Sequence, residues 1–318
     1  MNNLYKTIKK NNLFKLILGL GNKSLENIKK YSAIYSKAGA DMFDLSPDKD
    51  VFQAVYEGIK SQNLDIDDFL FCISVAINDD MHGKKAYIVQ KECVKCLKCL
   101  KQCPHGAIVF DKKVTVIQDK CIGCQKCHCS AIKYKRPKSD AIEAVKSVLG
   151  YKIDCIEVHI SGAKAKDSLS FFKKIRQKFP NIHVGVCVSR ENFSNKKLEK
   201  FIKQLKEISG ENKLILQADG VSMSGQKDSY ASTLQAVAMA QMFEKSDIYI
   251  ILSGGCNSKT KELAKICDVK INGIAIGSYG RILLLEEVNN SEFWYNKKVF
   301  NSALKKAQEL VNSVKANS

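Results

Sequence analysis

The sequence has no long apolar segment. No stretch approaches the roughly 18 uncharged apolar residues that a membrane-spanning helix needs. The chain opens with MNNLYKTIKKNNLFKLILGLG, where a basic start precedes a short apolar run, but Lys15 interrupts that run and no small-residue cleavage site follows. We therefore expect this segment to be a first β-strand, and the protein to be soluble, cytoplasmic and not membrane-spanning.

Arginine is also scarce. The net charge is +18 at pH 7, with 51 basic residues against 33 acidic ones, yet only four of the basic residues are arginine. Nucleic-acid-binding proteins favour arginine because its guanidinium can form two hydrogen bonds at once with a phosphate or a base. The lysines here are spread over the expected helices, without a basic tail or interleaved aromatic residues. We expect no nucleic-acid partner, and we expect the positive charge to guide encounter with an acidic electron-transfer partner.

Cysteine, in contrast, is abundant, and the first of two cysteine runs reads KECVKCLKCLKQCPHGAI at residues 91–108. A disulfide framework fits poorly, because a chain of 318 residues can bury its own core and its 13 cysteines are an odd number. Structural zinc fits poorly, because it usually takes two C-x2-C pairs separated by a longer loop. The spacing C-x2-C-x2-C-x3-C-P is the one that bacterial ferredoxins use. It predicts a [4Fe-4S] cluster with ligands among Cys93, Cys96, Cys99 and Cys103.

The second run, CIGCQKCHCSAI at residues 121–132, is irregular. A regular tail would place a cysteine at position 131, where Ala131 stands, so Cys129 is the nearest substitute. On this alignment one cluster uses Cys93, Cys96, Cys99 and Cys129, and the other uses Cys121, Cys124, Cys127 and Cys103. Aligned instead on the tails CPHGAI and CHCSAI, Cys127 matches Cys103 and the regular third ligand is missing. We expect two [4Fe-4S] clusters, with a degenerate second site as the alternative.

Outside the cysteine runs, short apolar segments alternate with helical patterns, which is typical of repeated strand-helix units on a parallel sheet. Eight such units predict an α/β fold, a (β/α)8 TIM-like barrel, with an open doubly wound sheet as the alternative. The expected strands span residues 14–21, 41–46, 69–77, 153–161, 182–189, 213–220, 248–255 and 271–278.

The cysteine segment lies between the third strand and a helix that begins near Asp140. We therefore expect two domains, a discontinuous barrel at residues 1–77 and 134–318 and a ferredoxin-like insertion at residues 78–133. Loops that follow strands lie on the catalytic face of such barrels. An insertion in the third of these loops would place the clusters above the barrel mouth.

The mouth can be predicted from the residues that end the strands. These residues include Asp44, Ser46, His159, Ser161, Ser189, Arg190, Asp219 and Ser253. After the last two strands, LSGGCN and AIGSYGR place glycines and a guanidinium where barrels commonly bind phosphate. A candidate anion site for a small substrate or a phosphate-bearing organic cofactor such as a flavin consists of Gly254, Gly255, Gly277, Ser278 and Arg281. Alternatively, the glycines only allow tight turns, and His159 and Asp219 are structural.

Several motifs together resemble the light-dependent period iron-sulfur protein family. They are KLILGLGN, IYSKAGADMFDLSPD, the two cysteine runs, QADGVSMSG, LSGGCN and IAIGSYGR, and they cover the chain to about residue 290. The resemblance implies iron-sulfur clusters and a role in redox sensing or electron transfer with a redox partner protein or a small redox molecule. An oxidoreductase, in which the clusters pass electrons to an anionic substrate or flavin-type cofactor at the mouth, is the alternative function.

Overall fold

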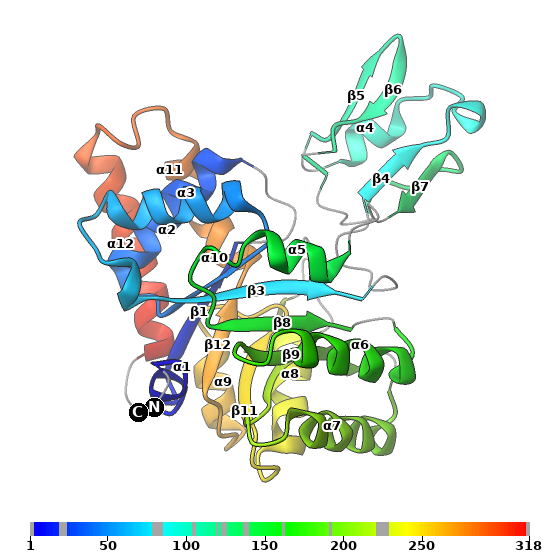
Figure 1. Ribbon diagram of the computed structural model, residues 1–318. Helices are drawn as coiled ribbons and strands as arrows, with labels where there is room; N and C mark the ends of the chain where they lie inside the picture. The colour runs from blue at the N-terminus through cyan, green and yellow to red at the C-terminus, as the bar shows by residue number, and fades with distance from the viewer. Residues whose placement is uncertain are drawn as a thin grey trace.

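Eight parallel strands close into a barrel in the computed structural model (Figure 1). The structure describes residues 3–18, 24–77, 85–103, 106–118, 120–121, 126–135, 140–160, 163–190, 193–220 and 229–315. The barrel strands are β1 (Leu13–Ile17), β2 (Met42–Leu45), β3 (Leu70–Ala76), β8 (Cys155–His159), β9 (His183–Ser189), β10 (Ile215–Asp219), β11 (Tyr249–Ser253) and β12 (Gly273–Ile276). Because β12 pairs with β1, with Gly273 opposite Leu13, the sheet has no edge. The predicted barrel is confirmed, and the open sheet is wrong.

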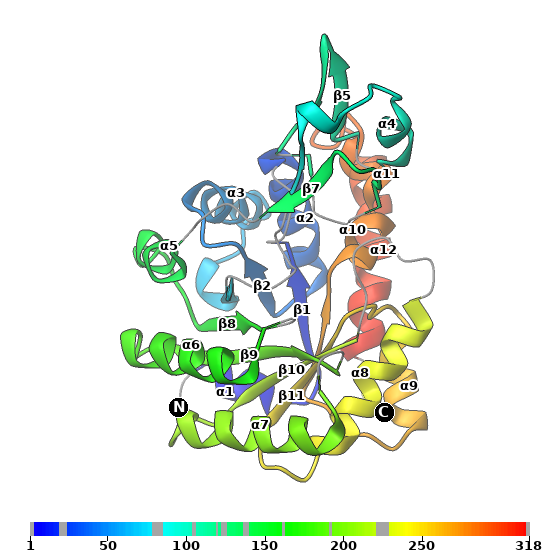
Figure 2. The same cartoon turned by 90° about the vertical axis from the view of Figure 1, so that its right-hand side faces the viewer.

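Helices surround the barrel (Figures 1 and 2). They are α2 (Leu25–Ala38), η1 (Ile66–Asp68), α3 (Lys49–Lys60), α5 (Ala141–Ser147), α6 (Ala165–Lys178), α7 (Asn195–Ser209), α8 (Ser229–Phe243), α9 (Thr260–Ile266), α10 (Ser278–Leu283), α11 (Leu285–Asn289) and α12 (Lys297–Lys315). Helix α2 begins where Ser24 accepts the N–H of Asn27 (3.3 Å) and ends at Gly39, whose φ of 94° favours glycine. Its buried face packs on the strands, since Phe14 of β1 stacks on Tyr35. No helix in the described part of the chain is long and apolar enough to cross a membrane.

A short amino-terminal helix, α1 (Asn3–Ile8), packs at the end of the barrel where the strands begin (Figure 1). Its Leu4 and Ile8 join one buried cluster with Leu13, Leu70 and other residues at the starts of the strands. The larger apolar core lies between the outer faces of the strands and the helices. The barrel interior is thus sealed by apolar side chains at this end, and its polar groups lie further along the strands.

His183 lies at this sealed end, where its ring packs edge-on against Tyr5. The Tyr5 hydroxyl is 2.8 Å from His183 Nδ1, and Nε2 has no hydrogen-bond partner among the described residues. Burial lowers the pKa of His183 from 6.5 to about 4, and the charge of the nearby Arg176 contributes to this shift. The imidazole is therefore neutral in the folded protein at neutral pH.

We expect this histidine to make folding sensitive to acid. Between about pH 6.5 and 4 the unfolded chain binds the proton and the folded chain does not, so stability falls as the pH falls, by up to about 3 kcal/mol. Chemical denaturation at pH 7 and 4.5 should show a smaller acid-induced loss in His183→Gln than in wild type. Tyr5→Phe, which keeps the histidine, should retain the wild-type dependence. Equal losses in His183→Gln and wild type would contradict the assignment.

The segment between β3 and β8 forms a separate small structure, called here the cluster module (residues 85–135). Its elements are β4 (Lys85–Ile88), η2 (Gln90–Glu92), α4 (Lys98–Gln102), β5 (Ile108–Asp111), β6 (Lys113–Val116) and β7 (Ile132–Lys135). Strand β4 pairs antiparallel with β7, and β5 with β6. Figures 1 and 2 show the module standing to one side of the barrel, where β3 ends. The division into domains at residues 78 and 133 stays a prediction.

Candidate functional site

The first three cysteines of the module lie on a tightly turned stretch of backbone. Cys93 follows η2 and Cys99 lies on α4, while Lys95 and Leu97 between them have φ angles of 52° and 60°. Residues other than glycine rarely adopt this left-handed backbone conformation. Here it turns the chain twice within five residues, as a loop that wraps around one centre requires.

The thiol of Cys99 interacts with cysteines from both runs. Burial raises its pKa, and Cys129, Cys93 and Cys96 raise it further as like-charged neighbours. Cys129 is exposed and comes from the second run, whereas Cys99 is buried. Electrostatic interactions therefore connect Cys99 with thiols of both cysteine runs.

A second group forms around Cys127. Burial raises the pKa of this thiol, and the thiols of Cys103 and Cys121 raise it further. A hydrogen bond with the Tyr134 hydroxyl, 3.0 Å away, lowers it. Cys124 lies outside the described residues. Backbone N–H groups point at two of the sulfurs, Ala107 at Cys103 (3.3 Å) and Ala86 at Cys121 (3.4 Å). Such donors stabilise negatively charged sulfur.

The chemistry of these donors fits iron-sulfur ligation. All the described cysteines are free thiols, so no disulfide competes for them. Sulfur-only donor sets with N–H groups directed at the sulfurs are typical of [4Fe-4S] sites. The buried residues Ala86, Ile108, Val114 and Ile132 form a small apolar core beside the thiols, which limits access of water.

The barrel interior holds a second polar cluster, centred on Lys15. This side chain is 1% exposed, and its Nζ lies 2.9 Å from Asp44 Oδ2, 2.6 Å from Glu157 Oε2 and 2.9 Å from Gln217 Oε1. Burial alone would lower the pKa of Lys15, but Asp44 and the other anionic neighbours raise it well above its usual range. Burial would raise the pKa of Glu157, but Lys15 and His159 lower it to about 2. The ammonium and the Glu157 carboxylate are therefore charged at neutral pH.

The cluster continues toward the ends of β8, β9 and β10. Glu157 Oε1 accepts a hydrogen bond from Gln217 Nε2 (2.8 Å) and lies 3.0 Å from His159 Nε2. On the next two strands, Cys187 Sγ lies 3.7 Å from Asp219 Oδ2. We call the whole set the interior network: Lys15, Asp44, Ser74, Glu157, His159, Cys187, Gln217 and Asp219.

Three of the predicted mouth residues, Asp44, His159 and Asp219, thus belong to one connected network. Lys15, Glu157 and Gln217 were not predicted as site residues. Each stands in the middle of its strand between two apolar residues, in LFKLI, CIEVH and ILQAD. Because strands of a parallel barrel are buried on both faces, a charged or amide side chain inside one is the signal that could have found them.

The other mouth residues are dispersed. Ser46 is half-buried, Ser161 lies outside the described residues, and Arg190 Nη2 donates to Asn195 Oδ1 (2.8 Å). Ser189 Oγ is buried without a hydrogen-bond partner among the described residues, and the Ser253 carbonyl accepts the N–H of Gly220. These residues make no common site in the described structure.

The glycines of LSGGCN have a packing role. Gly254 has a φ of 70°, and a β-carbon there would lie 2.0 Å from Asp219 Oδ1 and 2.1 Å from the Gly220 carbonyl oxygen. Only glycine lets the chain after β11 approach Asp219 and Gly220 this closely. The carbonyl of the next residue, Gly255, accepts a hydrogen bond from Thr233 Oγ1 (2.9 Å).

The remaining residues of the predicted anion site lie together at the start of α10. The Arg281 guanidinium donates to the Ile17 carbonyl at the end of β1, and its Nη2 lies 3.4 Å from Ser278 Oγ. Gly277 precedes the helix, and its β-carbon position is 3.6 Å from Arg281 Nη1. Part of the guanidinium is thus directed at the backbone of the chain itself. Anion binding here stays a prediction.

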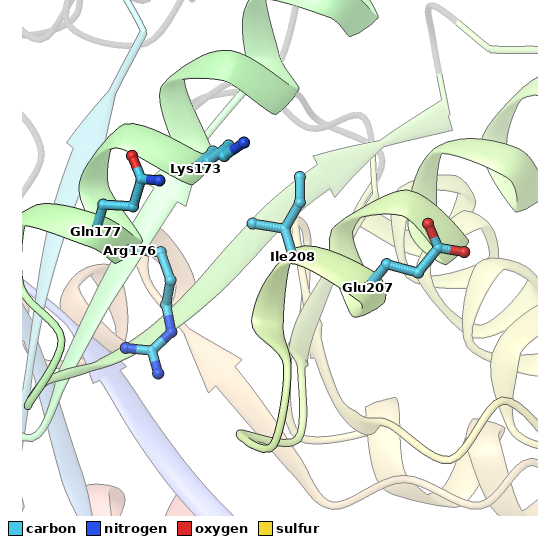
Figure 3. A pocket seen from close by; sticks show the side chains of 5 residues that line it. All are labelled: Lys173, Arg176, Gln177, Glu207 and Ile208. Carbon is cyan, nitrogen blue, oxygen red and sulfur yellow. The ribbon is translucent and has the colours of Figure 1, made fainter.

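A cavity of about 370 Å³ lies elsewhere, on the outside of the barrel between α6 and α7 (Figure 3). Its lining residues are Lys173, Arg176, Gln177, Glu207 and Ile208. Arg176 Nη1 already donates to the Pro180 carbonyl (2.9 Å), which fixes the turn after α6. The cavity contains none of the predicted site residues.

Comparison with known proteins gives two family matches. The model described as "Light dependent period A C-terminal domain" matches residues 147–313, and the "4Fe-4S binding domain" matches residues 86–109, which include all four cysteines of the first run. A curated relative, Light dependent period A of Synechococcus elongatus, is 25% identical over an alignment that covers 86% of this chain and 81% of the relative.

Two solved structures are similar to the chain over most of its length. The YdjI aldolase from Escherichia coli K12 has a TM-score of 0.51 at 7% identity, covering 99% of this chain and 97% of the aldolase. A putative fructose-1,6-biphosphate aldolase from Coccidioides immitis has a TM-score of 0.49 at 8% identity, covering 98% and 92%. At such low identity the first likeness shows the fold alone.

Proposed function

The chain belongs to the light dependent period A family and carries a 4Fe-4S binding motif, and we propose that it senses redox state or transfers electrons through two [4Fe-4S] clusters in the cluster module. The observation that carries this proposal is the grouping of the thiols. Cys99 interacts with Cys93, Cys96 and Cys129, and Cys127 interacts with Cys103 and Cys121. This grouping supports the alignment in which each cysteine run completes the site of the other.

In this proposal Cys93, Cys96, Cys99 and Cys129 hold one cluster, and Cys103, Cys121, Cys124 and Cys127 hold the other. A bound [4Fe-4S] cluster supplies reversible one-electron transfer. The N–H groups of Ala86 and Ala107 donate to sulfurs of the second group, and they would stabilise the more negative, reduced state of a cluster held there.

A partner can reach the first group. Cys96 and Cys129 are exposed, and Val94 beside them is 83% exposed. Exposed lysines surround this end of the module: Lys91, Lys95, Lys98, Lys101 and Lys126. Positive charge around an exposed redox site speeds encounter with an acidic partner. We therefore propose an acidic redox protein or a small anionic redox molecule as the partner.

An oxidoreductase is the second candidate, and the interior network favours it. Lys15, Glu157 and His159 place ionisable groups inside the barrel, and the module is inserted after a barrel strand. Electrons from the clusters would then reach a flavin-type cofactor or an anionic substrate at the mouth. Such a cofactor would co-purify with the protein or restore turnover.

Anaerobic purification followed by metal, sulfide and organic-cofactor analysis tests both functions. We expect about eight iron and eight sulfide per chain, and visible absorbance that dithionite bleaches and a mild oxidant restores. Stoichiometric zinc without sulfide, or clusters that cannot be reduced reversibly, would contradict the redox proposal. A bound organic chromophore would favour the oxidoreductase.

A further inference from the structure

Three different metal-binding side chains meet inside the barrel at β8 and β9. Glu157, His159 and Cys187 each offer a ligand atom, and these atoms all lie within 4.8 Å of one another. All three side chains are buried, and none is close in sequence to the cysteine runs. The parallel register explains the meeting, because His159 pairs with Cys187 across the two strands and Glu157 lies two residues earlier on the same face.

A fourth ligand lies on the next strand. Asp219 Oδ2 is 3.7 Å from Cys187 Sγ, and Gly254 leaves the space that its carboxylate occupies. With bonds of about 2.3 Å to sulfur and about 2.1 Å to oxygen, tetrahedral zinc separates these two ligand atoms by about 3.6 Å. A nitrogen and an oxygen ligand would be about 3.4 Å apart, and His159 Nε2 lies 3.0 Å from Glu157 Oε1. Asp219 is not among the side chains whose ligand atoms all lie within 4.8 Å of one another, so its carboxylate would have to move toward His159 and Glu157 to complete the set.

The surrounding groups favour a positive charge at the centre of this set. Lys15 Nζ donates a hydrogen bond to Glu157 Oε2, and the other carboxylate oxygen, Oε1, faces His159. Ser74 gives its only proton to Asp44 (2.6 Å), so at His159 Nε2 the serine oxygen is an acceptor (3.2 Å). His159 Nε2 thus faces two acceptors and carries a proton in the metal-free protein, and a bound metal would take the place of that proton.

Anionic groups outnumber cationic ones in this network. The interior network contains three carboxylates, those of Asp44, Glu157 and Asp219, against one ammonium, that of Lys15. With His159 neutral and Cys187 as a thiolate, a bound divalent cation would leave these groups with a net charge of −1. Gln217 Nε2 supports the ligands from outside, donating to Glu157 Oε1 (2.8 Å) and lying 3.6 Å from Cys187 Sγ.

We propose that Glu157, His159, Cys187 and Asp219 form a tetrahedral site for a divalent transition metal inside the barrel, separate from the clusters. Sulfur, imidazole and carboxylate together select zinc or ferrous iron rather than magnesium or calcium. The metal takes the place of a proton on the Cys187 thiol, as metals do at cysteine. The barrel of this iron-sulfur protein then carries a metal centre of its own.

Cobalt is the probe, because Co²⁺ replaces zinc in tetrahedral sites and absorbs visibly when a thiolate binds it. Full-length protein with assembled clusters is stripped of loosely held metal by a chelator and titrated anaerobically with Co²⁺, recording difference spectra. We expect one cobalt per chain and a thiolate-to-cobalt charge-transfer band. Cys187→Ser should lose this band and bind Zn²⁺ more than about 100-fold more weakly, since even the partners that orient a ligand account for 10- to 100-fold.

Cys267→Ser is the matched control, because it removes a partly buried thiol after α9, outside the network. It should keep the wild-type spectrum. His159→Gln serves as a second variant and should weaken Zn²⁺ binding while the cluster absorbance stays unchanged. A wild type without a cobalt-thiolate band would overturn the site. So would an unchanged band in Cys187→Ser, because the cobalt would then sit on other cysteines.

Discussion

Replacing Cys129 by serine is expected to halve the iron content of the protein, from about eight to about four per chain. Cys99 interacts with Cys93 and Cys96 of its own run and with Cys129, which comes from the second cysteine run. A serine there removes one of four thiolate ligands. Because Cys129 is exposed, the substitution removes little packing energy and the module should still fold.

Iron and sulfide analysis with electron paramagnetic resonance of the reduced protein measures this effect. The cluster at Cys103, Cys121 and Cys127 should keep its signal in Cys129→Ser, while the other signal disappears. Cys267→Ser controls for the loss of a thiol as such. Retention of both clusters in Cys129→Ser would mean that the fourth ligand lies elsewhere. A wild type with only four iron would instead support the degenerate second site.

The barrel could be predicted from the sequence because each strand contributes a short apolar run that is buried on both faces. The runs LFCISVA and HVGVCVS are examples, and both are strands of the barrel. The module could be placed after the third strand for the same reason, since it interrupts a regular alternation. These are local signals, and they do not depend on how the strands meet.

The interior network could not be predicted, because it depends on closure. Lys15 contacts Glu157 and Gln217, which follow it by 142 and 202 positions, and only the register of a closed barrel brings them together. Arg281 is a residue whose importance the sequence indicated but whose partner it did not. Its isolation among lysines indicated a special role, but a sequence does not tell whether a guanidinium meets a ligand or, as at Ile17, a carbonyl of its own chain.

Removing the charge of Lys15 is expected to have the largest effect on stability. Lys15→Met keeps the length of the side chain but leaves Asp44 and Glu157 buried without their ammonium. Breaking a buried ion pair by removing one partner costs about 3–5 kcal/mol, because the remaining charge cannot be solvated. Lys29→Met is the matched control, since the Lys29–Glu57 pair (2.9 Å) is solvent-exposed and should be worth about 1 kcal/mol or less.

Chemical denaturation of the two variants and the wild type at several pH values measures this difference. In Lys15→Met, burial without the ammonium raises the folded-state pKa values of Asp44 and Glu157 above their unfolded values. Between those values the folded variant binds more protons, so its deficit relative to wild type should shrink as the pH falls from 7 toward 5. A deficit no larger than that of Lys29→Met, or one that is independent of pH, would mean that the ammonium is not what keeps these carboxylates charged.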